Sequence, residues 1–161
     1  MTQKYKTAAS VVLGMHDALV SLTGMIGGLT FALAERRLII LTAVIASVAA
    51  GLSMAASNYL AEKTNENPYA IYAGAITGAA YLATCAALIL PFIIITNTNI
   101  ALIMSFVTAI VIIFGCNFFI CHRQGRSFWR HAIEMLIICV GVSVISFVMG
   151  EFAKRTLGVL I

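Results

Sequence analysis

Charged residues are scarce in this chain of 161 residues: Asp, Glu, Lys and Arg make up only 10% of it, against 61% hydrophobic residues. A soluble domain usually carries about a quarter charged residues. With a mean hydropathy of +1.03, this scarcity excludes an ordinary water-facing surface. The length has room for roughly five membrane spans of about 20 residues each, and none for a separate soluble domain. We therefore predict one transmembrane domain over residues 1–161.

The sequence also lacks the cysteine spacings of metal and redox motifs. Its four cysteines lie in or beside apolar runs and form no CxxC pair, so a disulfide framework or a zinc site is not predicted. Buried free thiols are the expected state. No nucleophile–base set and no cofactor motif is found, so we predict neither an enzyme nor a bound cofactor. The cysteines are Cys85, Cys116, Cys121 and Cys139.

Long apolar runs are what the chain has instead. A helix satisfies its own backbone hydrogen bonds in lipid, whereas a β-barrel would need an alternating pattern that is not seen here. We predict an all-α integral membrane protein with five transmembrane helices per subunit. Pro91 lies inside the third run and is expected to kink it. The runs cover residues 8–34, 38–61, 69–96, 100–120 and 131–150.

The basic residues lie in small groups at the ends of these runs. The net charge is +4, but this placement is typical of topology signals and lipid-headgroup contacts, so we predict membrane lipid and no nucleic acid as partner. The N-terminus and loops 62–68 and 122–130 carry more of them than the other side, which favours a cytoplasmic N-terminus. The two sets are Lys4, Lys6, Lys63, Arg123, Arg126 and Arg130, against Arg36, Arg37, Lys154 and Arg155.

Small residues recur at intervals of four in two of the runs. Gly24, Gly28 and Ala32 lie in the first, and Gly74 and Gly78 in the third. This spacing lets helices approach closely. Packing within one subunit and packing between subunits both remain open at this point.

Polar residues inside the runs are the candidates for function. Asp17 interrupts the first run, and an acid at that depth costs about 2.5–3.5 kcal/mol on insertion scales, so it usually faces a polar path or a partner. Met54, Asn58 and Glu62 recur every four residues near the end of the second run, which forms one stripe on a helix. Two antiparallel helices joined by a short turn would bring Asp17 close to Met54 and Asn58.

This combination of side chains suits a transported metal ion. A carboxylate supplies charge and an amide supplies neutral oxygen, while a thioether favours transition metals over Ca²⁺ or Mg²⁺. A partly hydrated, incomplete site can release what it binds. The predicted metal-site residues are Asp17, Met54, Asn58, Glu62 and His16.

Each of these residues also has a plainer reading, which for Met54 is packing in the apolar core. Asn58 fits an interhelical hydrogen bond as well as a ligand, and Glu62 fits a solvated helix end. His16, which points about 100° away from Asp17 on a helix, fits a second ligand, a proton acceptor or an interfacial residue. Asp17 itself fits an intramembrane salt bridge or a helix cap.

Two motifs resemble the vacuolar iron transporter family. HDALVSLTGMIGGLTFA resembles that family's Asp-Gly-Leu-Val-Ser opening, with Ala18 in place of the usual Gly. VAAGLSMAASNYLAEK resembles its Gly-x-x-Ser-Met-x-x-x-x-Tyr-Leu motif. The likeness continues through the third span, the basic loop and the fifth span. The stretches that carry it there are GAITGAAYLATCAALILPFIII and GRSFWRHAIEMLIICVGVSVISFVMGE. Together with the first two motifs, the likeness covers nearly the whole chain.

The resemblance implies a homodimer of five-helix subunits that moves Fe²⁺, and in some members Mn²⁺, out of the cytosol in exchange for protons. It places the path near the dimer interface, with Asp17 and Met54 at the motif positions that carry the metal. Asn58 stands where many bacterial members have Glu. The short EKTNENP segment implies a compact member without the glutamate-rich cytoplasmic metal-binding domain.

Two further expectations complete the prediction. The compact size favours a prokaryotic inner membrane. The rival from another functional class is a membrane scaffold or a subunit of a larger complex that transports nothing, in which Asp17 and the small-residue stripes serve assembly.

Overall fold

The computed structural model describes residues 3–33, 35–124 and 128–157, and the side chains of residues 8–31, 35–116, 118 and 133–152. This part of the chain is helical almost throughout and contains no strand. Its elements are α1 (Gln3–Leu33), α2 (Arg36–Thr64), α3 (Ala70–Ile94), α4 (Thr98–Gln124) and α5 (Phe128–Leu157).

Each described helix contains a stretch that is long and apolar enough to cross a membrane. The predicted all-helical class with five spans is therefore confirmed. α1, α4 and α5 extend beyond their spanning stretches because the chain stays helical through its polar ends, whereas α2 and α3 coincide with theirs. The spanning stretches are Ala8–Phe31, Arg36–Thr64, Ala70–Ile94, Thr98–Cys116 and Ile133–Phe152.

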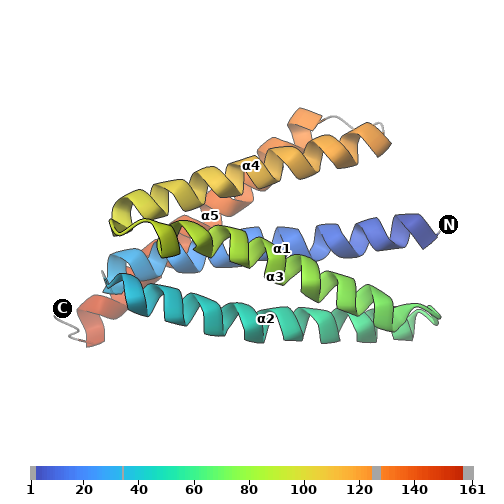
Figure 1. The fold of residues 1–161 in the computed structure, drawn as a ribbon, viewed down its shortest axis with the longest axis horizontal. Coiled ribbons are helices and arrows are strands. Elements are labelled where there is room, and N and C mark those ends of the chain that lie inside the picture. Colours follow the sequence, from blue (N-terminus) through green and yellow to red (C-terminus); the bar gives the residue numbers. More distant parts are fainter. Residues whose placement is uncertain (1–2, 34, 125–127, 158–161) are drawn as a thin grey trace.

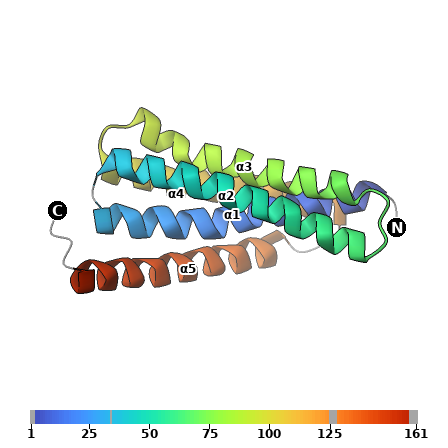
Figure 2. The ribbon, with the colours of Figure 1, turned by 90° about the horizontal axis from the view of Figure 1, so that it is seen from below.

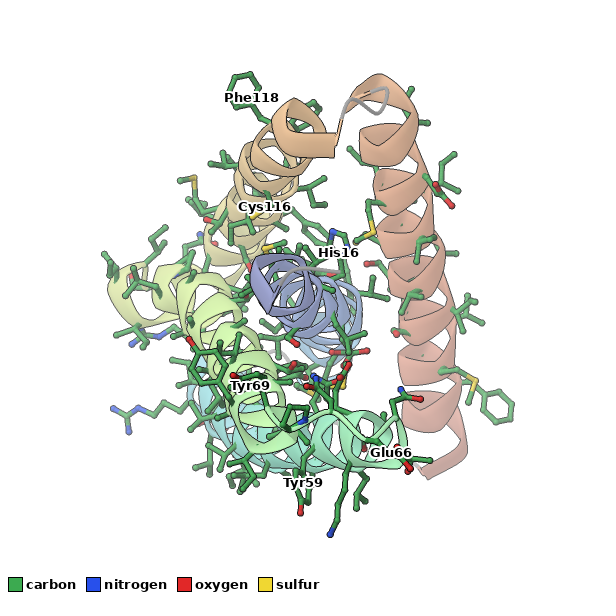
Figure 3. The ribbon with its side chains drawn as sticks, turned by 90° about the vertical axis from the view of Figure 1, so that its right-hand side faces the viewer. His16, Tyr59, Glu66, Tyr69, Cys116 and Phe118 are labelled. Carbon is green, nitrogen blue, oxygen red and sulfur yellow. The ribbon has the colours of Figure 1, made fainter. Side chains whose placement is uncertain are left out.

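The helices run alternately up and down around α1, which contacts each of the other four (Figures 1 and 3). The start of α1, the α2–α3 turn, the end of α4 and the start of α5 share one end of the bundle (Figure 1). This is the grouping that the count of basic residues assumed. Of the residues in that count, Arg36, Arg37 and Lys63 are described with side chains, and the others lie outside the described side chains.

Both small-residue stripes pack inside this single chain. A Cβ on Gly74 would lie 2.6 Å from the Ala55 carbonyl oxygen of α2, so the backbones of α2 and α3 are in near contact there. A Cβ on Gly28 would lie 3.0 Å from the Ser146 carbonyl oxygen, so α1 and α5 also approach closely there. In Figure 2, α5 lies along the side of α1 opposite α2 and α3. The side chain of Ala32 lies outside the described residues.

At the opposite end of the bundle, the side chain of Arg36 links the start of α2 to the end of α3. The Arg36 guanidinium at the start of α2 donates hydrogen bonds to the carbonyls of Phe92 (3.1 Å) and Ile95 (3.3 Å) at the end of α3. These carbonyls have no partner further along the helix, so Arg36 satisfies acceptors that lipid could not. Pro91 lies in this last turn, and α3 continues through it to Ile94.

Candidate functional site

Asp17 lies within the spanning stretch of α1, and its side chain is exposed on the surface of this single chain. One turn later, the Ser21 hydroxyl donates to the Asp17 backbone carbonyl at 2.7 Å. The Ser21 oxygen also lies 3.1 Å from the Tyr81 hydroxyl of α3. Either hydroxyl can be the donor in this pair. The Asp17 carboxylate is near enough to act electrostatically on both Tyr81 and Cys85.

The groups around Asp17 include three buried polar side chains that sequence reasoning missed. Tyr81 and Cys85 are 2% and 1% exposed on α3. Ser47 of α2 is 4% exposed and lies beside the Cys85 thiol. The available signal was the four-residue spacing of Thr77, Tyr81 and Cys85 along α3, the same spacing that singled out the stripe on α2.

Asn58 joins three helices. Its amide nitrogen donates to the Thr77 hydroxyl of α3 at 2.6 Å, to the Ala73 carbonyl at 3.2 Å and to the Ser10 hydroxyl of α1 at 3.3 Å. The interhelical hydrogen bond that the sequence allowed is therefore present. A metal-ligand role for Asn58 stays a prediction.

Asn58 and Asp17 lie at different depths in the bundle. Asn58 is level with Ser10, which precedes Asp17 by seven residues, or about 10 Å along a helix axis. Asp17 instead shares its level with Tyr81 and Cys85. The structure thus places the amide and the carboxylate about two turns apart, rather than side by side as expected.

Met54 lies between these two levels. It is one turn from Asn58 along α2, in the direction of the Asp17 level. Its side chain is half-buried and packs against the apolar core. A thioether at this depth could meet an ion that passes between the amide and the carboxylate, and this role also stays a prediction.

Glu62 closes the turn between α2 and α3. Its carboxylate accepts a hydrogen bond from the Asn67 side chain, and its backbone carbonyl accepts from the Asn67 N–H at 3.0 Å. Glu66 in the same turn has a positive φ of 53° and an exposed side chain at the end of the bundle (Figure 3). Glu62, at the end of the Met54–Asn58–Glu62 stripe on α2, therefore has a structural role in the turn. A metal-ligand role for Glu62 stays a prediction.

His16 lies on another side of α1. Figure 3 shows it toward α4 and α5, away from α2. On the neighbouring α4-facing side, the Cys116 thiol meets the Met15 sulfur at 2.8 Å. The structure therefore does not group His16 with the α2 stripe. Among the described residues, no three His, Cys, Asp or Glu side chains are placed to hold one metal ion.

Comparison with known proteins places the candidate residues within one family's sequence pattern. A comparison with the curated proteins gives no match. The model of the VIT family matches residues 8–71, the segment that contains Asp17, Met54 and Asn58. The resemblance found in the sequence is thereby confirmed over these residues, and it indicates a metal ion transporter. Over residues 8–71, which supply most of α1, all of α2 and the turn into α3, the chain is similar to the vacuolar iron transporter (VIT) family.

Proposed function

We propose that this protein moves divalent transition-metal ions out of the cytosol, Fe²⁺ first and Mn²⁺ second. The observation that carries the proposal is the position of Asp17. An acid inside a membrane span, beside the Ser21 and Tyr81 hydroxyls and within the family-matched segment, suits a passing cation. A purely structural acid would be expected to pair with a cation, and no salt bridge to Asp17 is found among the described residues.

The proposed path follows α2 inward from the α2–α3 turn. An ion would meet Glu62 at the end of the bundle, the Asn58 amide, the Met54 sulfur and then the Asp17 carboxylate. Such a series of partial sites holds an ion without trapping it. Met54 favours softer ions over Mg²⁺.

Exchange for protons would follow from the chemistry of Asp17. The ionised carboxylate attracts a divalent cation, whereas the protonated carboxyl releases it. A proton entering from the far side would therefore displace the metal, and a pH gradient would drive export. We further propose that the N-terminus is cytoplasmic, and that the host membrane is a prokaryotic inner membrane.

A homodimer would protect this path from lipid. The Asp17 side chain is exposed in the single chain, and a carboxylate facing hydrocarbon is expensive. A second copy laid against this face of α1 would cover it and enclose water beside it. The dimer is part of the proposal.

Metal uptake into proteoliposomes tests the proposal. The purified chain should move Fe²⁺ under anaerobic conditions, then Mn²⁺, ahead of Co²⁺, Zn²⁺ and Mg²⁺, and uptake should depend on an imposed pH gradient. Asp17→Asn should abolish uptake with the fold intact. Glu35→Gln is the matched control, because Glu35 is an exposed acid in the α1–α2 connection. Uptake at the parent rate by Asp17→Asn would refute the site.

A further inference from the structure

The Asn58 side chain is held by hydrogen bonds that only its nitrogen can make. The Ala73 carbonyl, 3.2 Å from the Asn58 nitrogen, is an acceptor only. The Thr77 hydroxyl places its own proton on the Ser10 carbonyl at 3.1 Å or the Ala73 carbonyl at 3.0 Å. Its oxygen is then left to accept from Asn58. The reverse amide orientation would set two carbonyl oxygens against each other, so the network fixes which end is nitrogen.

This orientation decides what Asn58 offers to an ion. Because the Asn58 side-chain nitrogen is hydrogen-bonded to α1 and α3, the side-chain carbonyl oxygen points away from these partners. The side chain is only half-buried, so the oxygen is the end available for contact. A rotated amide would instead present N–H groups, which repel a cation.

The backbone makes this arrangement possible at Gly14. A Cβ on Gly14 would lie 2.1 Å from the Thr77 carbonyl oxygen, closer than any side chain allows. The missing side chain lets α1 and α3 approach until Ser10 and Thr77 are within hydrogen-bond distance. Thr77 is fully buried at this crossing.

We propose that Thr77 is a positioning residue for transport: it holds the Asn58 amide so that the carbonyl oxygen serves as a neutral ligand at the first intramembrane step. This inference rests on the proposed function and adds a residue that acts through Asn58. A neutral oxygen binds a divalent ion more weakly than a carboxylate and releases it more readily. Losing the Thr77 hydroxyl would therefore weaken ion binding and leave the later steps unchanged.

The test compares Thr77→Val, which keeps the shape and removes the hydroxyl, with Thr77→Ser, which keeps the hydroxyl. The matched control is Thr84→Val, because within the described part of the chain the Thr84 hydroxyl bonds only to the Ala80 carbonyl of its own helix. Mn²⁺ uptake gives KM and maximal rate, and the Mn²⁺-dependent rise in Tm in detergent reports binding without transport. Thr77→Val should raise KM roughly three- to tenfold, the factor that one hydrogen bond is worth. Its maximal rate should stay at the parent level.

Thr77→Ser and Thr84→Val should keep the parent KM. In an Asn58→Ala background, Thr77→Val should have no further effect, because its action runs through the amide. Equal KM changes in Thr77→Val and Thr84→Val, or an undiminished effect without Asn58, would overturn the inference. Should Thr77→Val fail to fold, Thr77→Ala with the same readouts replaces it.

Failure of the proposed function gives a different result. A parent protein that moves no metal refutes transport, while its Mn²⁺-dependent Tm rise still tests Thr77 through the same variants. A parent protein that shows neither uptake nor a Tm rise refutes both proposals. Uptake that is unchanged in every Thr77 variant refutes only the positioning role.

Discussion

The Tyr81 hydroxyl of α3 and the Ser21 hydroxyl of α1 form a hydrogen bond of 3.1 Å, one turn from Asp17. Interhelical hydrogen bonds of this kind in membranes average about 0.6 kcal/mol. Tyr81→Phe and Ser21→Ala should each lower the free energy of unfolding, and the double variant should lose less than the sum. Unfolding in mixed micelles measures this coupling. Tyr72→Phe is the control, since Tyr72 is 54% exposed on the same helix. Strict additivity would contradict the bond.

Gly14 lies at a close approach of α1 to α3. Gly14→Ala places a methyl group 2.1 Å from the Thr77 carbonyl oxygen, and overpacking of this kind costs about 1–3 kcal/mol. We expect a lower Tm in detergent. Gly115→Ala and Gly141→Ala serve as controls, because a Cβ at either position meets none of the described atoms within 4 Å. A Gly14→Ala protein as stable as these controls would show that the helices separate at no cost.

Arg36 links the start of α2 to the carbonyls at the end of α3. Arg36→Met keeps the aliphatic stem and removes the donors, so three carbonyls at the end of α3, those of Phe92, Ile93 and Ile95, lose this partner. Hydrogen bonds to charged groups are worth about 1.5–3 kcal/mol, and partial exposure reduces this to about 1–2 kcal/mol. Thermal unfolding should show the loss. Arg37→Met, at an exposed neighbour, should leave Tm unchanged, and equal shifts in the two variants would argue against the cap.

Met54 provides a sulfur between the Asn58 and Asp17 levels. Met54→Ala should lower the ratio of Fe²⁺ to Mg²⁺ uptake in proteoliposomes, because the ligand that disfavours hard ions is lost. Met54→Leu keeps the volume and should lose the same selectivity, which separates chemistry from packing. Met104→Ala, at an exposed position of α4, is the control. An unchanged ratio of Fe²⁺ to Mg²⁺ uptake in both Met54 variants would contradict the proposal that Met54 contacts the transported ion.

Composition and run length were enough to predict the helical class and the number of spans, because lipid leaves few alternatives to a helix. The α2 stripe was also visible, since a four-residue spacing translates directly into one helix face. The level of each residue was harder to predict. Asp17 was expected beside Asn58, yet Ser10 takes that place. The relative height of two helices depends on contacts such as Gly14 against Thr77, which spacing within one helix does not encode.

The polar partners on α3 were missed for a related reason. Residues of the types Thr, Tyr and Cys are each common in apolar helices. The contacts of Thr77, Tyr81 and Cys85 with α1 and α2, which the sequence does not show, make them candidates for function. The small-residue stripes show the same limit. Their spacing predicted close helix approach, but whether α5 or a second subunit would fill the Gly24–Gly28 face required three-dimensional information.

The pairing of α1 with α5 joins the first helix to the last. Ser146 and Gly150 of α5 pack against the surface formed by Gly24 and Gly28 of α1. Because α5 is synthesised last, α1 gains this neighbour only after the other helices have been made. Until α5 is inserted, that glycine surface lies against lipid or against any other helix that reaches it. Biogenesis therefore includes a late closing step of high contact order. A chain cut before α5 should be recognised by membrane quality control as unfinished, even though it still contains residues 8–71, which the VIT family model matches.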